Sequence, residues 1–140
     1  MSWVGVVIGL PLDGLSDHVA TMLVAKQDGR VVGSAALEMY PDGALLRSVA
    51  VAEALRGQHV GHELTEAAIR LARDRHAPAV YLLTTTADQF FPKFGFERIT
   101  RADVPESVRR SVEFTSACPS SATVMRHRLV TTVLFACIHN

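Results

Sequence analysis

The chain has 140 residues, of which 49% are apolar and 20% charged, and this size and balance indicate one compact domain rather than a disordered segment. Its formal net charge of zero excludes a general electrostatic attraction to nucleic acid or to an anionic membrane. The two cysteines, Cys118 and Cys137, are too few for a disulfide scaffold and lack metal-ligand spacing, so we expect a cytoplasmic protein. The apolar runs 3–10 and 129–138 are shorter than the about 20 residues of a membrane span, and the first lacks the basic leader of a signal peptide.

The first part of the chain predicts strands joined by tight turns. The Asp-Gly pair at 28–29 is a strong hairpin signal, and the Pro-Asp-Gly run at 41–43 marks a second turn. Nearer the start we expect a loop at 9–14 and one helical turn at 15–18. The apolar runs around these turns predict strands over residues 3–8, 20–26, 31–40 and 44–51.

The second part predicts a strand–helix–strand crossover. Apolar residues recur along 60–76 with the rhythm of one buried helix face, and Ala77-Pro78 ends this helix. The continuous apolar run 79–85 suits a central strand that is covered on both faces, and it should lie parallel to the strand at 44–51. The remaining elements are expected to be a short helix at 87–94 ended by Gly95, a strand at 96–100, a helix at 105–112 and a last strand at 122–129.

A basic, glycine-containing turn at 56–61 leads from a strand directly into the long helix. The first N–H groups of a helix have no intrahelical acceptor and lie at the positive end of its dipole, so this junction predicts a phosphate or pyrophosphate site. The turn lacks the Gly-Lys-Ser/Thr ending of a Walker loop and the three-glycine spacing of a dinucleotide fingerprint. The alternative is a tight connection that uses glycine only for its conformational freedom.

Two motifs resemble the GCN5-related N-acetyltransferase (GNAT) superfamily. The segment 49–61 is similar to its V-x-V-x-x-x-x-R-G-x-G-x-G motif, and residues 91–96 are similar to its late F-x-x-x-G-F. Stretches 46–51 and 82–86 with Phe90-Phe91 resemble the acetylglutamate-synthase-like branch, and 113–125 resembles acetyltransferases associated with arsenic-resistance operons. The resemblance runs from about residue 20 to 129 and implies a single GNAT-like domain over 1–140, with 130–140 as a C-terminal extension. It implies an α/β (α+β) fold, with a mixed, mainly antiparallel sheet, a central βαβ crossover and splayed parallel strands.

The resemblance also implies acetyl-CoA as cosubstrate and a small, amino-acid-like amine as acceptor. The backbone of the strand end would pair with the pantetheine amides as an added strand. Arg47 would bind the acceptor's carboxylate. From the residues themselves, Thr84, Thr85 and Thr86 offer hydroxyls near the thioester; the alternative is that these β-branched residues serve strand propensity. The cofactor-binding residues implied in this way are Val49, Ala50, Val51, Arg56, Gly57, Gln58, His59, Val60, Gly61, His62 and Phe91.

Three departures from the family pattern favour an alternative, a catalytically weak or inactive acyl-CoA-binding or regulatory module. His59 replaces a glycine in the middle of the turn, which is a steric cost if this residue has positive φ. Phe91 replaces a tyrosine acid, and Leu45 replaces a glutamate base, for which Glu38 on the neighbouring strand is the nearest substitute. Glu38 is otherwise a solvent-facing strand residue.

Arg47 should share a strand face with Val49 and Val51 by the period of two and therefore look toward the cleft. Its alternative role is an ion pair with Glu38.

Neither end of the chain fits the family pattern fully. Fewer than about 20 residues precede the strand at 20–26, so the family's N-terminal helices are expected to be shortened. Both ends are apolar, and we expect them to pack together or across a homodimer. His59 and His62 have no recognisable third ligand, so we expect no metal.

Overall fold

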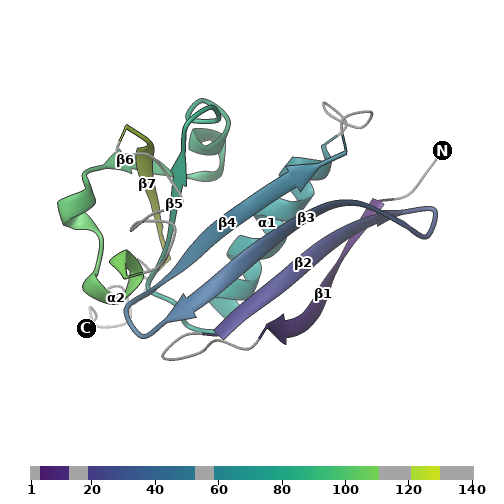
Figure 1. Cartoon of the computed structure of the whole chain (residues 1–140), viewed down its shortest axis with the longest axis horizontal. Helices are drawn as coiled ribbons and strands as arrows, with labels where there is room; N and C mark the ends of the chain where they lie inside the picture. Colours follow the sequence, from purple (N-terminus) through teal and green to yellow (C-terminus); the bar gives the residue numbers. More distant parts are fainter. Residues whose placement is uncertain (1–3, 13–18, 53–58, 111–120, 130–140) are drawn as a thin grey trace, which may run out of the picture.

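The computed structural model describes residues 4–12, 19–52, 59–110 and 121–129. Their strands form one seven-stranded sheet in the order β1-β2-β3-β4-β5-β7-β6 (Figure 1). Only the β4–β5 pair is parallel among these strands, and α1 connects the two. The mixed, mainly antiparallel α/β fold with a central crossover is therefore confirmed. The elements are β1 Val4–Leu12, β2 Val19–Gln27, β3 Arg30–Tyr40, β4 Gly43–Val51, α1 Val60–Asp74, β5 Ala79–Thr84, η2 Phe91–Phe94, β6 Glu97–Ile99, η3 Arg101–Asp103, α2 Glu106–Arg109 and β7 Thr123–Arg128.

The first strands form the expected meander. Asp28 and Gly29 both have positive φ, 53° and 79°, as the tight turn of a two-residue hairpin requires. The loop predicted at 9–14 is wrong over residues 9–12, because β1 continues to Leu12 with a register shift between Ile8 and Pro11. Proline is tolerated there because β1 lies at the edge of the sheet. The helical turn predicted at 15–18 falls outside the described residues.

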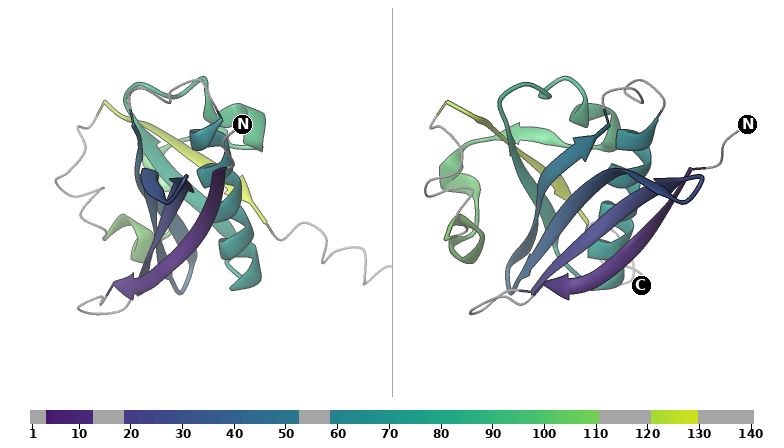
Figure 2. Two further views of the ribbon diagram at one scale, coloured as in Figure 1. Left: turned by 90° about the vertical axis from the view of Figure 1, so that its right-hand side faces the viewer. Right: turned by 45° about the vertical axis from the view of Figure 1, so that its right-hand side comes forward.

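Two layers of packing cover the two faces of the sheet. On one face, α1 packs over a large core that includes Leu23, Leu37, Leu46 and Leu64. On the other face, α2 lies beside the second part of the sheet (Figure 2). A smaller core there contains Tyr40, Leu45, Ala79, Tyr81, Val104, Val108 and Val124. Leu37 and Leu64 in the first core and Leu45 in the second are fully buried, so side chains pack on both faces of the sheet at β3 and β4.

A β-bulge in β4 changes which side chains share a face. Ala36 pairs with Arg47 and Ser34 pairs with Ala50, so two residues of β4 stand opposite one residue of β3. Before the bulge, Leu46 packs into the α1 core; after it, Val49 and Val51 pack against the same core. The prediction that Arg47 shares a face with Val49 and Val51 is therefore wrong. The extra residue restarts the period of two and leaves Arg47 on the face away from α1.

The later elements are shorter than expected. The helix predicted at 87–94 is a turn followed by a single 3₁₀ turn, η2, and Gly95 ends it with φ 100°. Pro92 lies in this turn and has no N–H to donate, which favours a short element. α2 covers Glu106–Arg109, and residues 111–112 of the predicted helix lie outside the described part of the chain. So do residues 130–140, on which the expected packing of the termini depends. None of the helices that the structure describes has the length and apolarity needed to cross a membrane.

Candidate functional site

The N-terminus of α1 has the geometry of an anion site. His59 is the N-cap, and its carbonyl oxygen accepts the N–H of Glu63 at 3.0 Å. The N–H groups of Val60, Gly61 and His62 precede the first intrahelical bond and lie at the positive end of the helix dipole. Within the described residues, no side chain of the N-cap accepts a hydrogen bond from them. Amides in this position bind phosphate groups readily.

His59, which stands where the family pattern has a glycine, adopts the left-handed backbone conformation. Its φ is 68° and its ψ 11°. For a residue with a Cβ this conformation costs about 1–2 kcal/mol, although histidine is found there more often than most residues. The turn therefore keeps the backbone path of a glycine, at some cost in stability. Arg56, Gly57 and Gln58, which are also predicted cofactor ligands, lie outside the described residues.

Gly61 has room for a side chain among the protein atoms. A Cβ built on it would lie 3.6 Å from Cζ of Phe90 and 3.8 Å from Cγ2 of Val51, both ordinary van der Waals contacts. Glycine in a helix costs roughly 0.5–1 kcal/mol relative to alanine. Packing within the described chain therefore does not explain this glycine.

The parallel strands β4 and β5 part next to this helix end (Figure 1). They pair only at Ala44–Val80 and Leu45–Tyr81 among the described residues, whereas β4 stays paired with β3 as far as Val51. The edge of β4 that faces β5 therefore offers backbone N–H and C=O groups beyond Leu45. An extended ligand with amide groups can add to such an edge as a strand. Val49, Ala50 and Val51 lie on this part of β4, where Ala50 is exposed.

Glu38 and Arg47 form an ion pair on the face away from α1. Nη1 of Arg47 donates to Oε2 of Glu38 at 2.7 Å, and the hydroxyl of Tyr40 donates to Oε1 at 2.6 Å. Glu38 is 6% exposed, so its alternative as a solvent-facing residue is wrong, whereas the ion pair considered for Arg47 is present. Leu45 is fully buried opposite Glu38 in the ladder. Tyr40 was not predicted from the sequence, although its i, i+2 spacing from Glu38 on one strand was a usable signal.

Thr84 and Phe91 have structural contacts. Oγ1 of Thr84 accepts the N–H of Ala87 at 2.9 Å, which shapes the turn after β5. Phe91 is 6% exposed, and its ring packs edge to face on Phe90 and Phe96, at centroid distances of 5.1 and 5.7 Å. Their predicted roles toward the thioester and the cofactor stay predictions.

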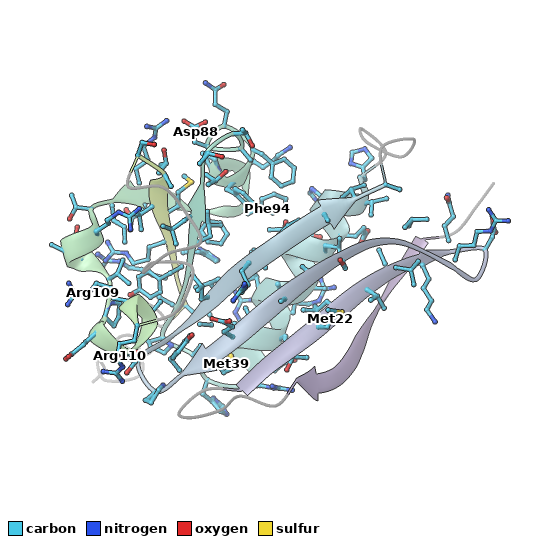
Figure 3. The ribbon with its side chains drawn as sticks, in the orientation of Figure 1. Met22, Met39, Asp88, Phe94, Arg109 and Arg110 are labelled. Carbon is cyan, nitrogen blue, oxygen red and sulfur yellow. The ribbon has the colours of Figure 1, made fainter. Side chains whose placement is uncertain are left out.

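A basic hollow of about 430 Å³ adjoins the helix end. It lies between α1, η2 and β7, and Phe94, labelled in Figure 3, points from η2 toward the His62 ring at a centroid distance of 4.9 Å. The hollow was not predicted, because Arg70 and Arg73 look like part of a solvated helix face until η2 and β7 are placed beside them. Its lining residues are His62, Glu66, Ile69, Arg70, Arg73, Lys93, Phe94 and His127.

His127 connects the hollow to the glycine of the late motif. Its Nδ1 lies 3.2 Å from the carbonyl oxygen of Gly95, and its ring packs on Phe96. Burial lowers the pKa of His127, and the charge of Arg73 lowers it further, while the Gly95 carbonyl raises it in part. Arg70, Arg73 and Lys93 bring positive charges to the hollow, and Glu66 is its acidic member.

The two histidines of the turn do not complete a metal site in the part of the chain that the structure describes. Their rings lie 5.9 Å apart, edge to face, and His62 also lies 3.5 Å from Glu66. Among the described residues there is no group of three or more His, Cys, Asp or Glu that could hold a metal ion.

Known proteins resemble the chain in sequence. The sequence model of the acetyltransferase (GNAT) family matches residues 8–96. An uncharacterised N-acetyltransferase of Chlorobaculum tepidum is 27% identical over 107 residues, which are 76% of this chain and 68% of the relative. An amino-acid acetyltransferase of Mycobacterium tuberculosis is 35% identical over 81 residues, which are 57% of this chain and 46% of the relative.

Solved structures share the fold. The N-acetylglutamate synthase of Neisseria gonorrhoeae, complexed with coenzyme A and N-acetyl-glutamate, superimposes with a TM-score of 0.68 at 22% identity and covers 77% of this chain but 25% of that one. A Mycobacterium tuberculosis protein in complex with CoA and NLQ reaches a TM-score of 0.67 at 29% identity, over 78% of this chain and 76% of that one. The chain thus spans only a part of some relatives. Since the family model covers well over half of the residues and the fold agrees, the chain belongs to the GNAT family of acetyl-CoA-dependent N-acetyltransferases.

Proposed function

We propose that this chain transfers the acetyl group of acetyl-CoA to the amine of a small, amino-acid-like acceptor. The observation that carries the proposal is the juxtaposition of three features: the parting of β4 and β5, the uncapped start of α1 and Arg47 two residues beyond the last β4–β5 pair. A cytoplasmic location and a homodimer stay predictions from the sequence.

The described residues fit coenzyme A along its length. The edge of β4 at Val49, Ala50 and Val51, which no described strand pairs on the β5 side, suits the pantetheine amides, and the amides of Val60 and Gly61 suit the pyrophosphate. The basic hollow continues from His62 and suits the phosphorylated adenosine end. His59 and His62 flank the pyrophosphate position, with Arg56, Gly57 and Gln58 expected to complete it. When bound, acetyl-CoA supplies the activated acetyl thioester.

Arg47 supports an acceptor that carries a carboxylate. Its guanidinium lies on the face away from α1, and its side chain is 24% exposed. A guanidinium binds a carboxylate with directional hydrogen bonds, which would set the position of the neighbouring amine. Relatives of this chain include amino-acid acetyltransferases, and a structural neighbour is complexed with N-acetyl-glutamate.

Direct transfer requires little covalent chemistry from the protein. The acceptor's nitrogen attacks the thioester carbonyl and passes a proton to water, and the C–S bond then breaks so that the thiolate leaves. The bulge at Ser48 and Val49 supports an oxyanion donor, because a bulge takes an N–H of β4 out of the ladder with β3. Phe91 has no proton to give, so the thiolate takes its proton from water.

Thermal unfolding with and without acetyl-CoA tests the proposal. Ligand at about 100 times its Kd should raise the free energy of unfolding by roughly 2.7 kcal/mol. Unfolding entropy is about 2.1 cal/mol/K per residue, so for 140 residues this gain corresponds to a Tm increase of about 9 °C. Absence of any shift at millimolar acetyl-CoA would refute both acetyl transfer and the binding module.

Thiol release across a panel of amino acids and small amines then separates the two functions. Acetyl transfer predicts release with at least one amino acid. A Tm shift without thiol release would favour the acyl-CoA-binding module. Leu45 supports this module, because its fully buried side chain occupies the place of the family's glutamate base.

A further inference from the structure

We infer that Glu38 and Tyr40 are positioning residues that hold the guanidinium of Arg47 for the acceptor's carboxylate, and that Glu38 does not take the proton of the amine. The inference rests on the proposed function, because it assigns residues of the same site. It replaces the role of substitute base that the sequence suggests for Glu38.

The three side chains meet because of the β3–β4 register. Glu38 pairs with Leu45, and Ala36 pairs with Arg47, so Glu38 and Arg47 are diagonal neighbours on one face. Tyr40 follows Glu38 by two residues and lies on the same face of β3. The bulge after Arg47 does not disturb this arrangement, since it begins at Ser48. The contact therefore depends on regular β structure, which holds its partners rigidly.

Each oxygen of the Glu38 carboxylate has a donor. Oε1 accepts the Tyr40 hydroxyl at 2.6 Å, and Oε2 accepts Nη1 of Arg47 at 2.7 Å. Two donors at different oxygens fix the carboxylate plane, and the carboxylate in turn fixes one nitrogen of the guanidinium. A planar guanidinium has five N–H groups in a rigid fork, so fixing one nitrogen restricts the direction of the others.

Glu38 and Tyr40 are less exposed to solvent than the Arg47 side chain that they hold. Arg47 has 24% of its side chain exposed, whereas Glu38 is 6% and Tyr40 8% exposed. A buried carboxylate without partners is costly, which explains why Glu38 retains both. Of the three side chains, that of Arg47 is the most accessible to an acceptor. A base must come within hydrogen-bonding distance of the amine, and Glu38 would have to exchange one of its donors to do so.

Steady-state kinetics with L-glutamate and L-isoglutamine test the assignment, since isoglutamine carries an amide in place of the α-carboxylate. We expect Tyr40→Phe and Glu38→Gln to raise KM for L-glutamate by about tenfold, equivalent to about 1.4 kcal/mol. The same variants should change kcat less than about twofold, keep the acid limb of the kcat/KM pH profile and reduce the preference for L-glutamate over L-isoglutamine. Glu97→Gln is the matched control, because Glu97 is also an arginine partner, at 3.0 Å from Arg126, on the distant strand β6.

If Glu38→Gln lost both kcat and the acid limb of the kcat/KM pH profile while Tyr40→Phe kept both, Glu38 would be the base. This result would overturn the inference. Unchanged kinetics in both variants would overturn it as well. Nitrogen-15 NMR of the Arg47 guanidinium gives a readout that needs no activity. Distinct, slowly exchanging Nη signals are expected in the wild type and averaged signals in both variants. If the wild type acetylates no amine, the proposed function fails, and averaged Arg47 signals in the wild type would then refute the positioning pair separately.

Discussion

The substitution Gly61→Ala should stabilise the fold and weaken the binding of coenzyme A. The added Cβ would meet Phe90 and Val51 at 3.6 and 3.8 Å, which are distances of ordinary contact. Alanine at a helical position gains roughly 0.5–1 kcal/mol over glycine. With an unfolding entropy of about 2.1 cal/mol/K per residue, the Tm of this 140-residue chain should rise by about 2–3 °C.

The same methyl group would occupy the approach of a phosphate to the α1 amides. Loss of one hydrogen bond to a charged group costs about 1.5–3 kcal/mol, so the Kd for coenzyme A should increase roughly 10- to 150-fold. Differential scanning calorimetry measures the first effect and isothermal titration calorimetry the second. Ala67→Gly, farther along α1, is the reverse substitution and should lower Tm while leaving the Kd unchanged.

An unchanged Kd in Gly61→Ala would refute the reasoning, because the glycine would then serve neither packing nor ligand. A lower Tm would refute the other half of it, since the contacts to Phe90 and Val51 would have to be tighter than the structure has them.

Three further predictions concern the late motif and the turn. Gly95→Ala should destabilise the protein by about 2–5 kcal/mol, from positive φ and overpacking. Gly95 has φ +100°, and a Cβ there would lie 2.8 Å from Cε1 of His127. Gly29→Ala is the control: Gly29 has φ +79° with nothing within 4 Å, so calorimetry should show only the cost of the positive φ. The pKa of His127 is lowered in the fold, so its contribution to stability is present above its ordinary pKa of 6.5 and is lost as pH falls through the folded pKa. In urea unfolding, the free energies of wild type and His127→Gln should differ above pH 6.5 and converge as pH falls through the folded pKa. Parallel pH profiles would contradict this. His59→Gly should change the free energy of unfolding by less than about 1 kcal/mol, because relief at φ 68° is offset by a freer unfolded chain; calorimetry should show equal or tighter coenzyme A binding, and a tenfold loss would instead indicate a contact from the imidazole.

Patterns that depend on neighbours in the chain could be predicted from the sequence. The helical rhythm that begins at Val60 predicted α1, and the Asp-Gly pair predicted the β2–β3 hairpin. The length of the crossover predicted that β4 and β5 are parallel. These signals are local because a helix face, a turn and a connection length each involve a few consecutive residues. The two glycine-containing motifs also indicated the family, which the comparisons confirm.

Features that depend on partners distant in the chain could not be predicted in the same way. The bulge in β4 arises from its pairing with β3, and the pattern of apolar residues over 44–51 does not predict it. As a result the period of two placed Arg47 on the wrong face. The basic hollow needs α1, η2 and β7 together, and the buried Glu38 takes its hydrogen bonds from Tyr40 on its own strand and from Arg47 on the next.

The sequence alone was sufficient for the kind of protein, because the family's glycine-containing turn and its F-x-x-x-G-F motif are short, contiguous stretches. Tertiary structure decided which groups lie together at the candidate site. It gave His59 its left-handed backbone, left room for a side chain at Gly61 among the described residues, and joined Glu38 to Arg47. The physical reason is that a side chain's direction and partners depend on register and packing across strands, and these are properties of the assembled sheet.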